Sequence, residues 1–257
     1  MPPAVPALAR RVLAWEVWVV FALSLGQSGV YALVSLLASL TTPKSLASQQ
    51  AVLNASAAPG RPWLDLTYQL IGLGFGVMPV VLVAYLLFRS GEGLRVLGAD
   101  LSRPAYDVVR GAVIAAVVGG VGLGFYLVTH AAGVDLTVVP ENLPAVWWRI
   151  PVLVLSAVQN AVLEEVVVLG FLLHRLEQLG WGRGRALVAS ALVRGSYHLY
   201  QGVGGFAGNA VMGLLFGKLY QRWGRVGPLV VAHTLIDTVA FVGYALLAGK
   251  VSWLPTP

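Results

Sequence analysis

The chain has 257 residues, of which 58% are apolar and only 11% are charged. Soluble domains carry about 25% charged residues, so this chain has too few to cover the surface of a water-soluble fold. A disordered chain is excluded as well, because disorder needs low hydrophobicity and high net charge. The chain contains no cysteine, which excludes disulfides, thiolate metal sites and a cysteine nucleophile. The apolar runs are continuous and helix-length, so the composition predicts a helical integral membrane protein.

Seven apolar stretches are candidates for helices that cross the bilayer, for which about 20 residues are needed. They cover, in chain order, residues 14–40, 65–88, 105–131, 148–175, 186–201, 205–221 and 226–248. The segment between the first two, 41–64, is rich in small residues and is predicted to be a loop. We expect an all-α polytopic bundle of seven to eight transmembrane helices, forming a single integral membrane domain over residues 1–257.

The basic residues predict the orientation of this bundle. If the N-terminus is cytoplasmic, twelve of the 17 lysines and arginines lie on inner segments and four on outer segments. The inner set is Arg10, Arg11, Arg89, Arg95, Arg103, Arg110, Arg175, Arg183, Arg185, Lys218, Arg222 and Arg225. Cytoplasmic loops carry such an excess, so we expect the N-terminus to lie in the cytoplasm. The membrane that we expect for this chain is the bacterial plasma membrane. The net charge of +6 then reflects topology, and with no basic run in the chain we expect no nucleic-acid partner.

Several titratable residues nevertheless lie inside the predicted spans, where a charge costs about 2.5–3.5 kcal/mol even on the lenient insertion scale. They are Glu164 and Glu165 in the fourth span, Arg194 and His198 in the fifth, and His233 and Asp237 in the seventh. Counted from the basic end of each span, Glu164, His198, His233 and Asp237 lie 8 to 13 residues deep. At about 1.5 Å per residue these depths are roughly 12–20 Å, near the middle of the membrane. Three helices therefore place polar groups in one slab, as a shared site requires.

Two carboxylates and two imidazoles support more than one role. A carboxylate can act as a general base toward water, and imidazoles can orient that water, donate to an oxyanion or bind a metal. This combination can hydrolyse a peptide bond without a serine or cysteine nucleophile. The same groups can also form hydrogen bonds and ion pairs that only fix helix packing, or a path for protons through a transporter. From the residues alone these three interpretations stay open.

Three motifs in order narrow this choice. They read Glu164-Glu165-Val-Val-Val-Leu169-Gly-Phe171, Arg194-Gly-Ser-Tyr197-His198 and His233-Thr-Leu-Ile-Asp237. The trio resembles the CPBP family of intramembrane proteases, which comprises CAAX proteases and bacteriocin-processing enzymes and is also called Abi. The family pattern is Glu-Glu-xxx-Arg, then Phe-xxx-His, then His-xxx-Asn/Asp, each on a different membrane helix. The resemblance covers about residues 145–245, which we expect to form the catalytic core.

The resemblance implies a CAAX-protease-like membrane endopeptidase that acts on a membrane-anchored protein or peptide. By this resemblance Glu164 would activate the attacking water, and Glu165 would support it. His198 and His233 would assist the water or, together with Glu164, bind a divalent metal such as zinc. Asp237 would either stabilise the oxyanion or orient His233.

Asn160 lies one turn before Glu164 and is expected to join the same network.

The sequence departs from the family pattern at two positions: Leu169 replaces the motif arginine, and Arg194 replaces the motif phenylalanine. A buried guanidinium cannot lose its proton, so Arg194 needs an anionic partner or water. We therefore expect that the arginine has moved between helices and that Arg194 contacts Glu164 or Glu165. Two alternatives stay open: a non-catalytic immunity or scaffold protein of the same family, and a proton-coupled transporter.

Overall fold

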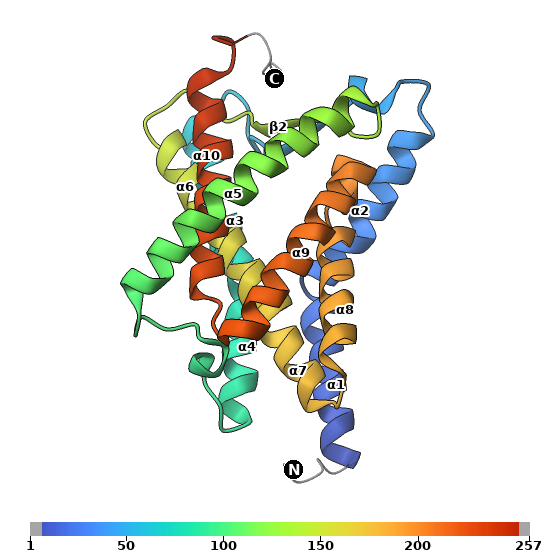
Figure 1. Cartoon of the computed structure of the whole chain (residues 1–257). Coiled ribbons are helices and arrows are strands. Elements are labelled where there is room, and N and C mark those ends of the chain that lie inside the picture. The colour runs from blue at the N-terminus through green and yellow to red at the C-terminus, as the bar shows by residue number, and fades with distance from the viewer. Residues whose placement is uncertain (1–6, 252–257) are drawn as a thin grey trace.

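The computed structural model describes residues 7–251, and most of them are helical (Figure 1). The structure contains, in chain order, the α-helices α1 (Ala7–Ala22), α2 (Leu25–Leu40), α3 (Pro62–Gly76), α4 (Met78–Arg89), α5 (Pro104–Ala131), α6 (Arg149–Glu164), α7 (Leu172–Gln178), α8 (Arg183–Ser196), α9 (Val203–Trp223) and α10 (Gly227–Leu247). The shorter elements are the 3₁₀ turns η1 (Leu46–Ser48), η2 (Leu94–Leu97) and η4 (Leu199–Gln201), the π-helical segment η3 (Glu165–Phe171), and the strands β1 (Gln50–Asn54) and β2 (Thr137–Glu141). The predicted all-α membrane bundle is confirmed.

Each of the seven predicted stretches is mainly helical, but four of them are not uniform. The second is divided into α3 and α4 at Val77, and the fifth passes from α8 through a turn into η4. The first is divided into α1 and α2, which are bent by 48° relative to each other. The fourth runs through α6, η3 and α7 as one helical rod with a π-helical middle. The predicted loop 41–64 contains strand β1, which pairs in parallel with β2 in a two-stranded sheet. The expectation of a plain loop is thus wrong at residues 50–54, because their pairing partner lies far along the chain.

Four helical stretches of the described residues are long and apolar enough to cross a membrane. They are 62–89, 104–131, 149–178 and 227–247, and the bent pair of α1 and α2 would make a fifth. Helix α8 does not meet this test because its 14 residues extend only about 21 Å. Helix α9 has 21 residues but carries Lys218 and Arg222 near its end. These two helices complete the bundle around the membrane-crossing ones.

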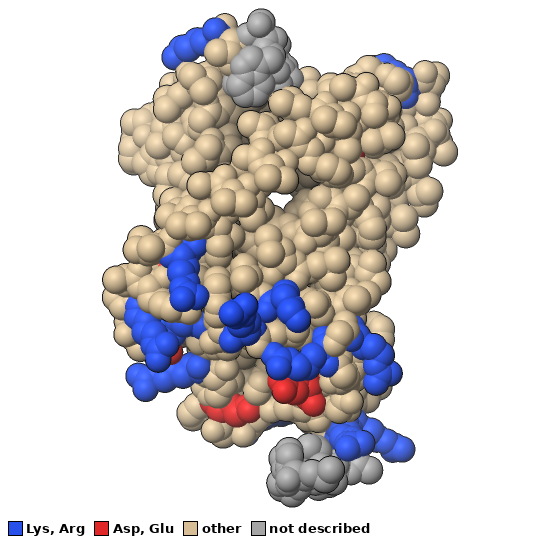
Figure 2. Space-filling model, in the orientation of Figure 1, with Lys and Arg blue, Asp and Glu red and all other residues tan. Residues whose placement is uncertain are grey.

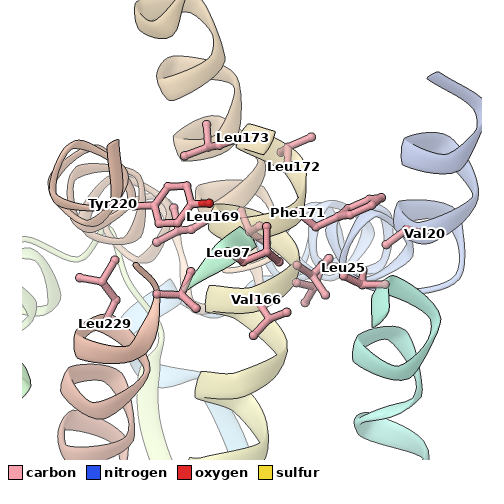
Figure 3. Close-up of a cluster of buried hydrophobic side chains, with 14 of the residues drawn as sticks. Val20, Leu25, Leu97, Val166, Leu169, Phe171, Leu172, Leu173, Tyr220 and Leu229 are labelled. Atoms are coloured by element: carbon pink, nitrogen blue, oxygen red, sulfur yellow. The ribbon is translucent and has the colours of Figure 1, made fainter. Parts of the chain in front are cut away.

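The rod of α6, η3 and α7 is the centre of the fold. In its most apolar 18-residue window 61% of the residues are buried, against 6% for α5, whose valines face outward. An apolar helix that exposes most of its surface suits a lipid environment. Figure 3 shows Val166, Leu169 and Phe171 of the central rod packed among side chains from α1, α2, α9 and α10. This cluster fixes the rod in place and so fixes the residues that it carries.

Charged side chains gather over the half of the visible face where the N-terminus lies, while most of the other half is almost free of them (Figures 1 and 2). Two buried arginines tie this end together. Arg175 contacts Glu16 at 3.0 Å and Glu92 at 3.1 Å. Arg225 forms two bonds of 2.7 Å with Asp107 and so joins the start of α10 to α5. The charge separation fits a membrane protein, and the cytoplasmic placement of this end stays a prediction.

Labelling of single cysteines can test that orientation, because the chain has no cysteine of its own. Lys44, Arg95, Arg222 and Lys250 are all exposed, so each can be replaced by cysteine without disturbing the core. A membrane-impermeant maleimide added to intact cells is expected to label positions 44 and 250 and to spare positions 95 and 222. Labelling of all four positions from one side would contradict the topology.

Candidate active site

The three motifs meet at the middle of the bundle. Glu164 is the last residue of α6 and Glu165 is the first residue of η3, so the carboxylates lie where the α-helix changes into a π-helix. π-Helical turns are rare and occur frequently at functional sites. Arg194 lies near the end of α8 and His198 in the turn that follows it, while His233 belongs to α10. The structure therefore brings together side chains that are up to 69 positions apart in the sequence.

The guanidinium of Arg194 lies at the centre of the cluster and is completely buried. Its Nη1 donates to Oε1 of Glu165 at 2.8 Å, and its Nη2 lies 3.3 Å from Oε2 of Glu164. The ring of Phe216 from α9 covers it at 5.5 Å. The contact predicted for Arg194 is present, with both carboxylates. Leu169, at the position of the family's arginine, is instead part of the apolar core.

His233 is held between two carboxylates. Its Nδ1 lies 2.8 Å from Oε1 of Glu165, and its Nε2 lies 3.5 Å from Oδ2 of Asp237, one turn further along α10. Arg194 Nη2 also approaches Nδ1, at 3.2 Å, but a guanidinium only donates, and Nδ1 cannot accept one bond while it donates another. The shorter distance favours donation from His233 to Glu165. The side chain of Asn160 bonds to Asp237, so the predicted supporting residue is in the network.

Glu164 and Glu165 differ in their access to water. The side chain of Glu164 is 11% exposed, whereas that of Glu165 is completely buried. Oε2 of Glu164 accepts a hydrogen bond of 2.9 Å from the hydroxyl of Tyr197. Glu165 is fixed by contacts from Arg194 and His233 to its Oε1. Glu164 is the carboxylate that can meet a water molecule.

His198 has a free nitrogen. Its Nδ1 lies 3.0 Å from the backbone oxygen of Arg194, so Nδ1 carries the proton and donates it. Nε2 is then an acceptor, and no hydrogen bond to it is found within residues 7–251. The ring lies between Tyr197, at 4.7 Å, and Tyr200, at 6.5 Å. His198 is therefore available to a water or a substrate, whereas both nitrogens of His233 are engaged.

Tyr197 is a site residue that the motifs do not identify. A tyrosine near a helix end in a membrane protein usually belongs to the aromatic belt at the membrane interface, so the sequence alone does not single out Tyr197 as a site residue. The available signal is that Tyr197 lies three residues after Arg194, on nearly the same face of the helix. A buried tyrosine also needs a partner for its hydroxyl, and Tyr197 is only 5% exposed.

The metal alternative does not fit this arrangement. Within the described part of the chain, no three His, Asp or Glu side chains are grouped so that they could hold a metal ion. The predicted metal ligands are Glu164, His198 and His233. The guanidinium of Arg194 lies against Glu164 and His233, and its fixed positive charge opposes a divalent cation at the same place. Both nitrogens of His233 also have partners already. We therefore derive no step through zinc.

Residues 146–239 match a family model described as Rce1-like, type II CAAX prenyl endopeptidase Rce1-like. The matched segment contains all three motifs together with Asn160, Arg194 and Tyr197. Comparison with curated proteins and with solved structures gives no match. The chain is an integral membrane protein, as both its apolar helices and this family indicate. The resemblance drawn from the motifs is confirmed by this match, which covers residues 146–239.

Proposed function

We propose that this protein is a membrane endopeptidase in which Glu164 activates a water molecule to cleave a peptide bond. The family match supports a CAAX-protease-like membrane endopeptidase, and the geometry of the cluster adds the mechanism. The observation that carries the proposal is the difference between the two glutamates: Glu165 is completely buried with Arg194 and His233 on its Oε1, and Glu164 is partly exposed beside a histidine with a free nitrogen.

In this mechanism a water molecule lies between Glu164 and Nε2 of His198. Glu164 takes a proton from the water as the oxygen attacks the peptide carbonyl carbon, and the carbonyl bond electrons move onto its oxygen. When the C–N bond breaks, Glu164 returns the proton to the leaving amine. The charge of Arg194, fixed before the reaction begins, stabilises the negative charge that develops in a site shielded from water. Asp237 orients His233, which in turn holds Glu165.

The proposal can be tested with the full-length protein in proteoliposomes. The probe is a ten-residue peptide that ends in a farnesylated cysteine followed by three uncharged residues, because the matched family is named for prenyl CAAX substrates. Mass spectrometry is expected to find a new carboxyl terminus with the wild type and none with Glu164→Gln. If folded wild-type protein cuts neither this probe nor a library of membrane-anchored peptides, the enzyme proposal fails. The non-catalytic immunity or scaffold alternative would then replace it.

Replacement of Tyr197 by phenylalanine tests the hydrogen bond to Glu164. A hydrogen bond to a charged group contributes about 1.5–3 kcal/mol, and its loss leaves Glu164 less firmly oriented. We expect kcat to fall by about tenfold to a hundredfold while KM changes little. Tyr220→Phe is a matched control, because Tyr220 is buried in the same apolar cluster but has no hydrogen bond to Glu164 among residues 7–251. Equal effects of the two changes would show that Tyr197 acts only through packing.

A further inference from the structure

An open groove lies beside the catalytic cluster, between α2 and the turn η4. Its volume is about 460 Å³, and its walls include Gln27, Ser28, Tyr31 and Ser35 of α2 together with Tyr197 and Tyr200. Tyr197 belongs both to this groove and to the cluster, because its hydroxyl donates to Glu164 at 2.9 Å. Tyr197 therefore links the wall of the groove to Glu164, the carboxylate that we propose as the base.

Helix α2 has two exposed flanks of different character. The flank that lines the groove carries Gln27, Tyr31 and Ser35, which follow one another at intervals of four residues and so form one row along the helix. The opposite flank carries exposed apolar side chains, among them Leu33 and Leu37. An apolar flank is well solvated by lipid chains, whereas amide and hydroxyl groups are not. The polar flank thus needs a polar occupant.

The side chains of the polar flank have few partners of their own. The side-chain amide of Gln27 has no hydrogen bond among residues 7–251. The hydroxyl of Ser28 makes a long hydrogen bond, 3.5 Å, to the backbone oxygen of Ser24 on its own helix. Gly29 faces the other way and lies against Ser196 of α8, so α2 is fixed on the bundle by its buried side. The groove therefore presents polar side chains, among them Gln27 and Ser28, that have hydrogen-bonding capacity left for a bound molecule.

We infer that this groove binds the extended, uncharged peptide segment of the substrate that adjoins the scissile bond. This inference rests on the function proposed above and adds the place and the chemistry of the substrate. An extended peptide inside the membrane needs partners for its backbone N–H and C=O groups, and the amide and hydroxyl groups of the α2 flank supply them. The three tyrosine rings offer flat apolar contacts to its side chains.

The size and charge of the groove agree with this occupant. Sites for small ligands have volumes of about 300–1,000 Å³, and the groove lies in this range. Its lining includes no charged side chain, so a charged residue of the peptide would lose its hydration without gaining a partner. Substrates are therefore selected for an uncharged segment next to the bond that is cut.

Photo-crosslinking can test the groove without any cleavage. The full-length Glu164→Gln protein in proteoliposomes carries p-benzoylphenylalanine in place of Tyr31 or Ser35, and the probe is the farnesylated peptide above with a biotin label. Matched variants carry the same group in place of Leu33 or Leu37, on the other flank of the same helix. Crosslinking is expected to be several-fold stronger from positions 31 and 35 and to be suppressed by unlabelled peptide. A peptide with lysine in the segment before the farnesylated cysteine should compete about tenfold less well.

Wild-type cleavage of the same peptide separates the two claims. If the wild type cleaves the peptide but all four positions crosslink equally, the groove inference is overturned and the enzyme proposal stands. If positions 31 and 35 crosslink selectively but the wild type never cleaves, the groove stands and the catalytic proposal fails. Equal crosslinking without cleavage overturns both. Kinetics of two further variants give a second test. Ser28→Trp narrows the groove and is expected to raise KM about tenfold with kcat retained, whereas Leu33→Trp, on the other flank, is expected to leave KM unchanged.

Discussion

Replacement of Arg194 by leucine is expected to lower the free energy of unfolding by about 3–5 kcal/mol. The reason is that Glu165 is completely buried and would lose its cationic partner at 2.8 Å, while Glu164 would lose one at 3.3 Å. Charges left unpaired in a buried site destabilise the folded state by more than a lost apolar contact does. Thermal unfolding in detergent, followed by fluorescence-detected size exclusion, measures the effect.

Arg185→Leu is a matched control for this prediction. Arg185 lies on the same helix α8 but is exposed, so its loss should change stability by no more than about 1 kcal/mol. The double change Leu169→Arg with Arg194→Phe restores the family pattern. Position 169 is one turn after Glu165, so an arginine there can reach the same carboxylate, and part of the lost stability should return. If Arg194→Leu is no more destabilising than Arg185→Leu, the ion pair is not what holds the cluster together.

The second large effect concerns activity and separates the two adjacent glutamates. Glu164→Gln is expected to reduce kcat by about 10²–10⁴-fold, the usual contribution of a general base, while the protein stays folded. Arg194 remains paired with Glu165 in this variant, so no buried charge is left alone. Glu165→Gln should instead destabilise the fold by about 3 kcal/mol, because it removes the carboxylate that Arg194 and His233 share.

Both variants should be measured by two assays, cleavage of the farnesylated peptide and unfolding in detergent. The result that agrees with our assignment is an inactive, stable Glu164→Gln protein beside a destabilised Glu165→Gln protein. The reverse pattern would assign the base to Glu165 and would contradict the argument from exposure. Normal cleavage by Glu164→Gln would remove the proposed mechanism altogether.

The main features of the fold follow from the sequence because hydropathy determines where membrane helices lie. The distances of Glu164, His198 and His233 from the basic ends of their helices already predict that they share a depth, and the structure shows them in one cluster. The loss of an arginine at position 169 and its gain at position 194 predict the contact between Arg194 and the glutamates. Both arguments work because a charge in a membrane must have a partner.

Other features leave no pattern in the sequence. The division between α1 and α2 has no proline to mark it, and the strands β1 and β2 pair across more than 80 residues. The different roles of Glu164 and Glu165 depend on which neighbours surround each carboxylate, and adjacent identical residues cannot show this. The hydrogen bond from Tyr197 is hidden for a similar reason, since the residue looks like an ordinary aromatic at a helix end.

The π-helical segment η3 also determines the angle, about the helix axis, between two groups of polar residues on the rod of α6, η3 and α7. At its start, Glu164 and Glu165 face Arg194; after it, Arg175 faces Glu16. A π-helix, with hydrogen bonds between residues i and i+5, turns by a smaller angle per residue than an α-helix does. The segment η3 therefore changes the angle about the helix axis between the side chains at its start and those after it. The directions of the carboxylates and of Arg175 are therefore matched through the π-helical geometry of the segment between them.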